Sequence, residues 1–464
     1  MNVLMVSSEF APWAKTGGLA DAVTGLANAL VARGHDVRVL LPRYAHLPGA
    51  GATLQPLRAG RHRFGELVTA AGERAAPRVY LLDLDELTAD SIYTADARDA
   101  GRFLRLAFAA LELPAALKWR PDILHCHDWH AALTPVLNRA APVAPTVLTL
   151  HNVGYQGVFA AEVLEQYAPP RLRQAIAADA LAGDDVNFLR AGVHAADVVT
   201  TVSPTYAAEI RTPQFGMGLE DLLSARGTTL VGILNGVDYD VWDPRCDPFL
   251  ATRFDATNLA PKRQLKNALA ARLGLQADAT TPLVGIVTRL APQKGIDLVT
   301  ASLPALLRET RATFAVLGSG DMALANALTG FAREQPRRVA FTEGYDEALA
   351  HLIFAASDLT LVPSRYEPCG LTQMYALRYG TIPVVRATGG LADTIEHFDP
   401  ATGTGNGSVF RDADVGGLSW GLRTALDWFD DRAAWSRLVA NAMAADFSWR
   451  NQVPHYERLY RTLL

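Results

Sequence analysis

The chain has 464 residues, of which 50% are hydrophobic and 20% are charged, and its formal net charge is −5. This length predicts roughly two domains, because a single hydrophobic core rarely serves so many residues. The charge gives no basic surplus that would attract a nucleic-acid backbone or an anionic membrane. No apolar stretch reaches the length of about 18 residues that a membrane helix needs. We therefore expect neither a nucleic acid nor a membrane as a partner.

The cysteines and the first residues indicate a cytoplasmic location. Cys126, Cys246 and Cys369 are widely spaced and include no C-x-x-C pair, a pattern that suits a reducing compartment. The first basic residue, Lys15, follows the N-terminal apolar run instead of preceding it. We therefore interpret this run as a strand and not as a secretory signal.

The N-terminal segment predicts a βαβ unit. Residues 2–10, NVLMVSSEF, form an apolar run that is typical of a buried parallel strand. The glycine turn KTGGLAD, from Lys15 to Asp21, comes next. Residues 19–35 then carry apolar side chains at helical spacing up to Gly34, which we expect to end the helix. The run DVRVLLP, residues 36–42, supplies the second strand.

The same alternation continues through most of the chain. Residues 234–249, LNGVDYDVWDPRCDPF, interrupt it, and their Asp, Pro and Gly content predicts an irregular interdomain connection. We therefore predict an α/β fold with two doubly wound domains, whose strand carboxyl ends face a shared cleft. The further predicted strands are residues 122–129, 146–153 and 196–203 before the connection, and 283–290, 312–320, 338–344, 359–364 and 382–387 after it.

The six residues TGGLAD occur twice, at Thr16–Asp21 and at Thr388–Asp393. Paired glycines lack Cβ atoms, so their backbone amides can approach a ligand closely. Both copies could instead be tight turns that pack a helix on a strand. Lys15, directly before the first copy, favours an anion site.

Two basic residues lie around the carboxyl end of the first predicted strand of the second half. Arg289 and Lys294 lie five positions apart in the sequence TRLAPQKG. A guanidinium offers a planar fork of donors and an ammonium offers a point charge, a combination that suits a diphosphate. The alternative is a solvated edge of the domain.

Glu367 precedes Pro368 in the sequence SRYEPCGLTQ. We predict that Pro368 occupies the first position of a helix, whose unpaired N–H groups would favour an anion or a sugar hydroxyl. Glu367 would then accept hydroxyl protons of a sugar, or would only complement the helix dipole. Cys369 has no His or Asn pattern nearby that supports a thiolate, so we interpret it as a packing thiol.

The stretch HCHDWH, residues 125–130, places His125 and His127 on one face of a predicted strand. We disfavour a metal site because zinc usually needs a fixed tetrahedral ligand set, and we expect the histidines to line a cleft. His151 ends another predicted strand, where it could meet a substrate. Walker, nucleophile-elbow and G-x-G-x-x-G motifs are absent, which argues against an ATPase and weakens a dehydrogenase assignment.

Seven motifs together resemble the bacterial glycogen synthases, the group that includes plant starch synthases. They are KTGGLAD, HDWH, HNVGYQG, NGVD, RLAPQKG, SRYEPCGLTQ and TGGLADT, which occur in the order of the family and span almost the whole chain. The resemblance implies a GT-B architecture. Residues 1–240, together with a crossing helix at 447–464, would form the acceptor-side domain, and residues 241–446 would bind the nucleotide sugar.

The resemblance also implies a reaction. Glucose would pass from ADP-glucose to the non-reducing end of an α-1,4-glucan, with retention of the anomeric configuration and without a metal or other cofactor. Many retaining members of the wider superfamily carry a second glutamate eight positions after the first, and this chain has Tyr375 there. This departure disfavours a mechanism with two carboxylates.

The resemblance implies roles for particular residues. Arg289 and Lys294 would neutralise the diphosphate, Glu367 would hold the glucose, and Tyr345 is a weaker candidate for packing on the adenine. His151 and Asp128 would lie beside the reacting sugar and complete the catalytic set. The implied substrate-binding set is Lys15, Gly17, Gly18, Asp21, Asn152, Asn235, Tyr345, Cys369, Gly370, Leu371, Thr372, Gly389, Gly390 and Leu391.

Three rival functions stay open on the sequence. A retaining glycosyltransferase of the same architecture could use UDP-glucose or a small acceptor. A non-catalytic protein could keep the fold and bind glucan without releasing ADP. A nicotinamide oxidoreductase is the weakest rival, and it would have to bind NAD.

Overall fold

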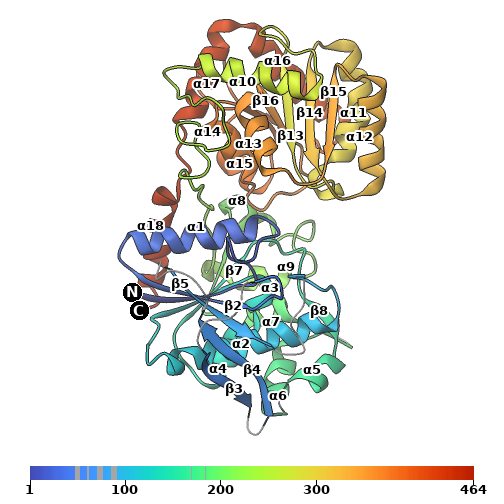
Figure 1. The fold of residues 1–464 in the computed structure, drawn as a ribbon. Coiled ribbons are helices and arrows are strands. Elements are labelled where there is room, and N and C mark those ends of the chain that lie inside the picture. Colours follow the sequence, from blue (N-terminus) through green and yellow to red (C-terminus); the bar gives the residue numbers. More distant parts are fainter. Residues whose placement is uncertain (48–52, 60–61, 70–76, 85–90, 169, 183) are drawn as a thin grey trace. The chain divides into compact units, whose positions relative to one another are not determined.

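The chain forms two compact α/β units, which Figure 1 shows in a computed structural model. Unit 1 comprises Met1–Gly236 and Trp449–Leu464, and unit 2 comprises Val237–Ser448. The structure describes residues 1–47, 53–59, 62–69, 77–84, 91–168, 170–182 and 184–464. The prediction of an α/β fold with doubly wound units is confirmed.

The main sheet of unit 1 has the strand order β12-β11-β7-β6-β1-β2-β5-β4-β3. Strands β12 to β5 in this order pair in parallel, whereas β4 and β3 add an antiparallel edge. The strands are β1 (Asn2–Val6), β2 (Asp36–Pro42), β3 (Thr53–Ala59), β4 (His62–Thr69), β5 (Arg78–Asp83), β6 (Ile123–His127), β7 (Thr146–Leu150), β11 (Val198–Thr201) and β12 (Leu230–Gly232).

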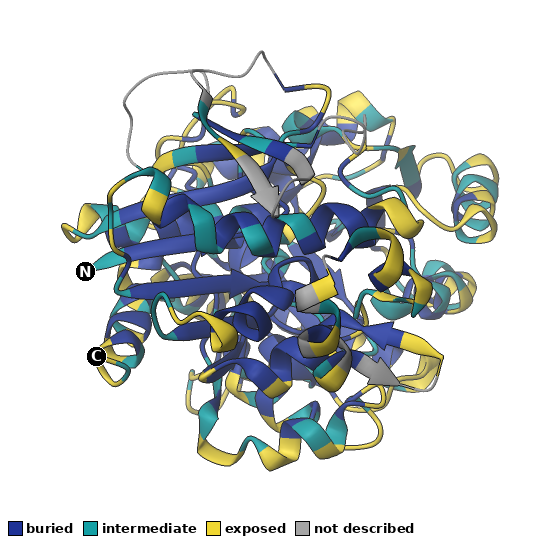
Figure 2. Ribbon diagram, turned by 90° about the horizontal axis from the view of Figure 1, so that it is seen from below, coloured by how far each residue is buried: buried dark blue, intermediate teal, exposed yellow. Residues whose placement is uncertain are grey.

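Alternating side chains of β1 supply two cores, one on each face of this sheet. Val3 and Met5 belong to one buried cluster, and Leu4 and Val6 belong to the other. Both faces are covered, as is usual for a parallel sheet, which explains why the strands are apolar without alternation. Figure 2 shows the strands buried along most of their length. The structure has a strand within each of the segments predicted at residues 2–10, 36–42, 122–129, 146–153 and 196–203, but all except 36–42 are shorter than predicted, and residues 128–129 belong to a helix.

Helices cover this sheet, and α1 (Gly18–Ala32) shows how the sequence sets their bounds. Gly17 is the N-cap residue of α1, and the chain leaves the helix through Gly34, whose φ of +85° lies in the left-handed region that favours glycine. The other helices of unit 1 are α2 (Ala97–Ala116), α3 (Asp128–Ala131), α4 (Leu133–Ala140), α5 (Glu162–Tyr167), α6 (Pro170–Ala180), α7 (Phe188–Ala195), α8 (Pro204–Glu209), α9 (Glu220–Ala225) and α18 (Trp449–Arg461). A small antiparallel sheet joins β8 (Val158–Ala160), β10 (Asp185–Asn187) and β9 (Leu181–Ala182).

The last helix, α18, packs on unit 1 through Trp449. A Cβ atom on Gly25 would lie 1.8 Å from the indole of Trp449, and one on Gly236 would lie 2.6 Å from its backbone. Both positions therefore need glycine so that the helix can approach. Arg33 donates to both carboxylate oxygens of Glu457, at 2.7 and 2.9 Å, which ties α18 to the end of α1.

Unit 2 has a parallel sheet with the order β15-β14-β13-β16-β17-β18. Its strands match those predicted at residues 283–290, 312–320, 338–344, 359–364 and 382–387, which are confirmed. They are β13 (Leu283–Val287), β14 (Thr313–Gly318), β15 (Val339–Glu343), β16 (Leu359–Val362), β17 (Ile382–Arg386) and β18 (Ser408–Phe410). The helices are α10 (Ala260–Leu273), α11 (Ile296–Glu309), α12 (Met322–Glu334), α13 (Glu347–Ala356), α14 (Thr372–Arg378), α15 (Gly389–Thr394), α16 (Val415–Asp430) and α17 (Arg432–Ala444).

Residues 234–249 contain neither helix nor strand, as predicted. The part of this segment within unit 2 is held by Trp242, whose ring is stacked between two others. The His351 ring lies 3.7 Å away on one side and the Tyr375 ring lies 4.0 Å away on the other, both nearly parallel to the indole. Tyr375, at the position of the second superfamily glutamate, therefore serves to pack this segment.

Among the described helices, none is long and apolar enough to cross a membrane.

Candidate active site

The first TGGLAD copy forms the start of α1, with Thr16 and Gly17 before the helix and Gly18–Asp21 within it, and it lies over a buried carboxylate. Glu9 is only 3% exposed, and its side chain accepts the backbone N–H groups of Thr16 at 2.7 Å and Gly17 at 3.2 Å. Lys15 extends from the same segment and donates to Asp21 at 2.7 Å. The structure thus brings Lys15, Gly17 and Asp21 together at the N-terminus of α1.

Asp128 and His151 meet at the carboxyl ends of β6 and β7. Asp128 directly follows β6, and its φ of +55° is in the left-handed region that few non-glycine residues adopt. Its Oδ1 accepts the backbone N–H of His151 at 2.6 Å. Burial raises the pKa of Asp128 to about 7, although hydrogen bonds from the backbones of His151 and Asn152 oppose this shift, and the charge of Glu9 adds to it. This carboxyl group is therefore close to its titration point at neutral pH.

The histidines of this region form a neutral cluster in which His127 is buried and His151 is partly buried. His127 Nδ1 and His151 Nε2 lie 3.1 Å apart and share a hydrogen bond. Burial lowers the pKa of His151 to about 3 and also lowers the pKa of His127. His127 Nε2 is buried without a hydrogen-bond partner among the described residues. Two neutral imidazoles can orient hydroxyl groups by donating and accepting, without adding charge.

The expectation that His125 and His127 share a face is consistent with their ring centroids, which lie 4.2 Å apart. His125 is occupied on both nitrogens, by Tyr460 Oη of α18 at 2.7 Å and by Thr149 Oγ1 at 2.6 Å. His125 therefore links α18 to the sheet. In the part of the chain that the structure describes, no group of three or more His, Cys, Asp or Glu side chains is placed to hold a metal ion.

Glu367 and Lys294 form the centre of the candidate site in unit 2. Lys294 ends a 3₁₀ turn (Pro292–Lys294) that follows β13, and its ammonium contacts Glu367 Oε2 at 2.6 Å. Ser364 donates its hydroxyl to the same oxygen at 2.7 Å. The Glu367 and Lys294 side chains are 6% and 19% exposed. Glu367 is thus held by a cation and a hydroxyl. Its interactions are therefore not limited to a favourable position near a helix N-terminus.

The prediction that Pro368 begins a helix is wrong. The helix α14 begins at Thr372, with Leu371 as its N-cap residue. Gly370 has a φ of +71°, which a right-handed helix cannot contain, and the Gln373 side chain donates to the carbonyls of Cys369 and Gly370. Residues 368–371 therefore form a turn before the helix. Cys369 is buried, which agrees with a packing role.

The second TGGLAD copy packs directly against this turn. The Gly390 N–H donates to the carbonyl of Glu367 at 3.0 Å. A Cβ atom on Gly390 would lie 2.1 Å from the carbonyl oxygen of Cys369, so this glycine is required by close packing. Gly389 adopts a φ of +44°, and Leu391 is fully buried. The second copy thus contacts both the backbone of Glu367 and the turn that follows it.

The other predicted site residues lie apart from these clusters or at their edges. Arg289 is exposed just beyond the end of β13. Tyr345 is 77% exposed after β15. Asn235 is buried in unit 1, and its Oδ1 has no hydrogen-bond partner among the described residues. A narrow pocket in unit 2 is lined by Val287, Thr288, Lys294, Ile296, Leu361, Val362, Pro363, Ser364 and Thr372.

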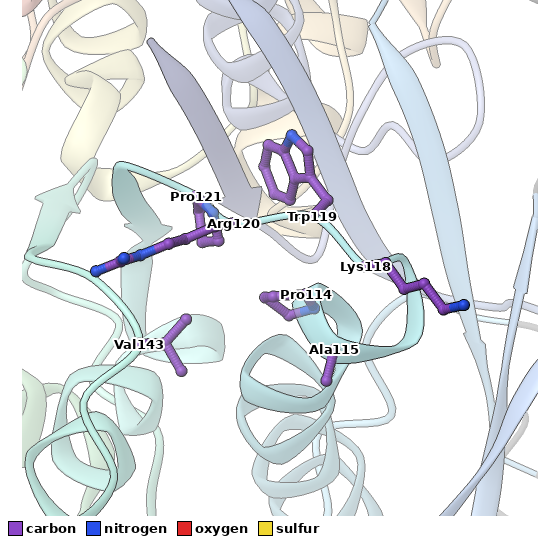
Figure 3. Close-up of a pocket in the computed structure, with 7 residues that line it drawn as sticks. All are labelled: Pro114, Ala115, Lys118, Trp119, Arg120, Pro121 and Val143. Atoms are coloured by element: carbon purple, nitrogen blue, oxygen red, sulfur yellow. The ribbon is translucent and has the colours of Figure 1, made fainter.

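A larger pocket of unit 1, about 310 Å³ in volume, contains none of the predicted residues. Figure 3 shows it between the end of α2 and the residues before β6 and β7. It therefore lies at the amino ends of these strands, opposite to Asp128 and His151. Its lining consists of Pro114, Ala115, Lys118, Trp119, Arg120, Pro121 and Val143.

Sequence reasoning missed three residues that organise the candidate site. Glu9 and Tyr93 hold the first glycine turn, and Ser364 holds Glu367. Glu9 and Tyr93 are 84 positions apart, and no local spacing connects them. Ser364 stands three positions before Glu367 in the motif SRYEPCGLTQ, and this nearness was a signal that could have been used.

Two known protein families match this chain, one in its first half and one in its second half. Residues 2–225 match the starch synthase catalytic domain family, and residues 271–438 match the family of glycosyl transferases group 1. A glycogen synthase from Anaeromyxobacter dehalogenans is 47% identical over 478 residues, with 100% of this chain and 99% of the relative covered. The chain belongs to the glycogen and starch synthase family. The resemblance inferred from the motifs is confirmed, and the chain is a glycosyltransferase.

Further relatives of this family extend the match. A glycogen synthase from Rhodospirillum rubrum is 43% identical, with 100% of this chain and 99% of the relative covered. The catalytic domain of starch synthase IV from Arabidopsis thaliana, solved bound to ADP and acarbose, has a TM-score of 0.88 at 35% identity and covers 99% of this chain and 98% of its own. A sucrose-phosphate synthase from Thermosynechococcus elongatus, at 18% identity and a TM-score of 0.65, covers 100% of this chain and 98% of its own and shares the fold.

Proposed function

We propose that this protein transfers glucose from ADP-glucose to the non-reducing end of an α-1,4-glucan, with retention of the anomeric configuration. The observation that carries this proposal is the full-length identity of 47% to a glycogen synthase, in a chain that keeps the family motifs. The similar plant enzyme was solved with ADP bound, which supports ADP as the leaving group. No further cofactor is required by this chemistry.

The Lys294–Glu367 pair supports a role in stabilising the departing diphosphate. An ammonium has three N–H donors, and Glu367 uses one of them at 2.6 Å. The other donors are thereby held in a fixed orientation, and donors fixed in advance stabilise negative charge that develops in the transition state. We assign the same electrostatic role to Arg289, whose guanidinium is exposed at the end of β13.

Glu367 and the glycine turn next to it would hold the glucose of the donor. Oε1 of Glu367 can accept hydrogen bonds from sugar hydroxyls, because Lys294 and Ser364 both contact Oε2. The turn formed by Cys369, Gly370, Leu371 and Thr372, together with Gly389, Gly390 and Leu391, would line the same pocket. Tyr345 would pack on the adenine.

The groups of unit 1 would serve the reacting sugar and the acceptor. His151 is neutral, so it can donate to or accept from a sugar hydroxyl without adding charge, and Asp128 fixes its backbone at 2.6 Å. Lys15, Gly17 and Gly18 would contact the donor from this unit, and Asp21, Asn152 and Asn235 complete the proposed substrate-binding set. In domain terms, residues 1–240 with 447–464 would form the acceptor side, and residues 241–446 would form the nucleotide-sugar side.

The incoming hydroxyl would lose its proton to a phosphate oxygen of the leaving group. Tyr375 occupies the position of the second superfamily glutamate and is stacked on Trp242, so it offers no carboxylate for a covalent intermediate. We also propose a cytoplasmic location. Among the described residues, none of the three cysteines forms a disulfide, which is compatible with a reducing compartment.

The direct test is an assay of nucleoside diphosphate release, which measures ADP from ADP-glucose and UDP from UDP-glucose, each with and without glycogen. The proposal predicts that ADP appears only when ADP-glucose and glycogen are both present. Equal or faster turnover of UDP-glucose would instead identify the UDP-dependent rival. Binding of glycogen without any release of ADP would identify a non-catalytic glucan-binding protein.

A further inference from the structure

Glu9 lies beneath the first TGGLAD copy, and its buried carboxylate accepts four hydrogen bonds. It follows β1 and is 3% exposed, whereas Thr16 and Gly17 above it are exposed. Oε2 accepts the N–H groups of Thr16 and Gly17, at 2.7 and 3.2 Å. Oε1 accepts the hydroxyls of Thr16 at 2.7 Å and of Tyr93 at 2.6 Å. All four bonds are directed to one side chain, which fixes the shape of this turn.

The fold itself does not require a glycine at position 17. Gly17 has a φ of −167°, an extended conformation that any residue can adopt, and a Cβ atom added there would have no neighbour within 4 Å. The outer face of the turn is therefore open, in contrast to Gly390 of the second copy. A small residue on an open face is consistent with the close approach of a ligand.

The hydrogen bonds of Glu9 also limit what the turn can offer to a ligand. The Gly17 N–H is used by Glu9, so Glu9 occupies one of the amides that an anion could otherwise bind. Lys15 directly precedes the segment that Glu9 holds, and α1 begins directly after it, at Gly18. The orientation of the Lys15 backbone thus depends on Glu9.

We propose that Glu9 is a positioning residue, which holds Lys15 and the start of α1 in the geometry that binds the anionic donor substrate. Tyr93 is its partner, because it fixes Oε1 from the segment before α2 and itself contacts Ser8 Oγ at 3.0 Å. This inference rests on the proposed function, since it names ADP-glucose as the ligand. It adds an internal carboxylate whose role is hydrogen bonding and not contact with the sugar.

The test compares Glu9→Gln with Glu9→Ala by their KM for ADP-glucose and their kcat. In Glu9→Gln, the amide oxygen can face the two N–H groups, and the amide nitrogen can face two hydroxyls that are able to rotate and accept. We expect Glu9→Gln to keep the KM within about 3-fold of the wild type, whereas Glu9→Ala raises it about 10-fold or more. Tyr93→Phe, which removes one of the four bonds, should fall between the two.

A matched control is Asp197→Ala. Asp197 accepts the N–H and hydroxyl of Thr146, both at 2.7 Å, at the amino end of β7 and away from the glycine turn. Removing it should lower the melting temperature and leave the KM unchanged. Amide hydrogen exchange at Thr16 and Gly17 should become faster in Glu9→Ala and should not change in Asp197→Ala.

Two results would overturn the positioning role. If Glu9→Gln were impaired as severely as Glu9→Ala, the charge of Glu9 would be the essential property and not its hydrogen bonds. If Glu9→Ala and Tyr93→Phe both kept the KM of the wild type, the turn would not need this support. A wild-type protein that releases no ADP would refute the proposed function instead, and the exchange of the Thr16 and Gly17 amides would still test the hydrogen-bonding role.

Discussion

At the scale of residues, short sequence motifs predict some of the side chains of the candidate site and miss others. Short motifs predict both Lys294 and Glu367 as site residues, and the structure joins them directly at 2.6 Å. Their selection was possible because each stands next to a predicted strand end, where ligands commonly bind in α/β sheets. Glu9 also stands near the end of a predicted strand, but its role could not be inferred, because its partner Tyr93 lies 84 positions away.

Replacing Lys294 by Gln should lower kcat on the order of 100-fold, because a fixed cation no longer stabilises the departing diphosphate. The amide of Gln can still donate to Glu367, so the melting temperature should change by only a few degrees. Initial rates of ADP release and thermal unfolding measure the two effects.

Lys266→Gln is the matched control for this prediction. Lys266 contacts Asp358 at 2.6 Å, is similarly shielded, and lies in the same unit away from the motif residues. Its replacement should reduce stability and leave kcat unchanged. Similar kcat values in the Lys294 and Lys266 variants would refute the role assigned to Lys294.

Asp128 should make the stability of the protein depend on pH. Burial raises its pKa from 3.8 to about 7 in the folded chain. Between about pH 4 and 7 the folded protein therefore holds a proton that the unfolded chain has lost, so the free energy of unfolding falls as the pH rises. This loss is at most about 4 kcal/mol, since each pKa unit corresponds to about 1.4 kcal/mol.

The variant Asp128→Asn cannot ionise and should escape this loss. The denaturation midpoint of Asp128→Asn minus that of the wild type should therefore be larger at pH 8 than at pH 5. The comparison between the two proteins cancels the contributions of His127 and His151, whose lowered pKa values affect both. If the midpoints of the two proteins differed by the same amount at pH 5 and pH 8, Asp128 would be ionised throughout this range.

At the scale of elements, the alternation of apolar runs and helical spacing was sufficient to locate most strands. Most of the predicted strands are buried on both faces, so a short apolar run bounded by polar residues indicates them, whereas the edge strand β15 is only partly buried. The start of α14 was less predictable. Pro368 is a common first residue of helices, but Gly370 with its positive φ and the Gln373 side chain delay the helix to Thr372.

The two TGGLAD copies differ in a way that the sequence could not show. Each copy forms the start of a helix, α1 from Gly18 and α15 from Gly389, yet Gly17 faces open space and Gly390 lies against the backbone of Cys369. Gly17→Ala should therefore leave stability unchanged or raise it slightly, because alanine reduces the entropy of the unfolded chain. Gly390→Ala should destabilise the protein by several kcal/mol, because its Cβ atom would overlap a carbonyl oxygen.

The measurement is thermal unfolding combined with the KM for ADP-glucose. Gly17→Ala should raise the KM without loss of stability, since an added methyl group would obstruct the ligand. If Gly17→Ala were instead as unstable as Gly390→Ala, the turn would be a packing element like the second copy. An unchanged KM in a stable Gly17→Ala protein would exclude close contact with the donor at this position.

At the scale of the whole molecule, the division into two α/β units could be predicted because the alternation of strands and helices stops and restarts around residues 234–249. The attachment of α18 depended on contacts that the sequence does not display, such as Tyr460 with His125 and Glu457 with Arg33. The full-length match to glycogen synthases, at up to 47% identity among those described above, joins both units in one enzyme.

The central claim is that glucose is transferred to the non-reducing ends of a glucan. The most direct test is to incubate the protein with glycogen and ADP-glucose labelled in the glucose, and then to digest the product with β-amylase, which removes maltose from non-reducing α-1,4 ends. The account predicts that the label enters the polysaccharide and is released early as maltose. Label that stays out of the glycogen, or that enters it and resists the digestion, would contradict the account.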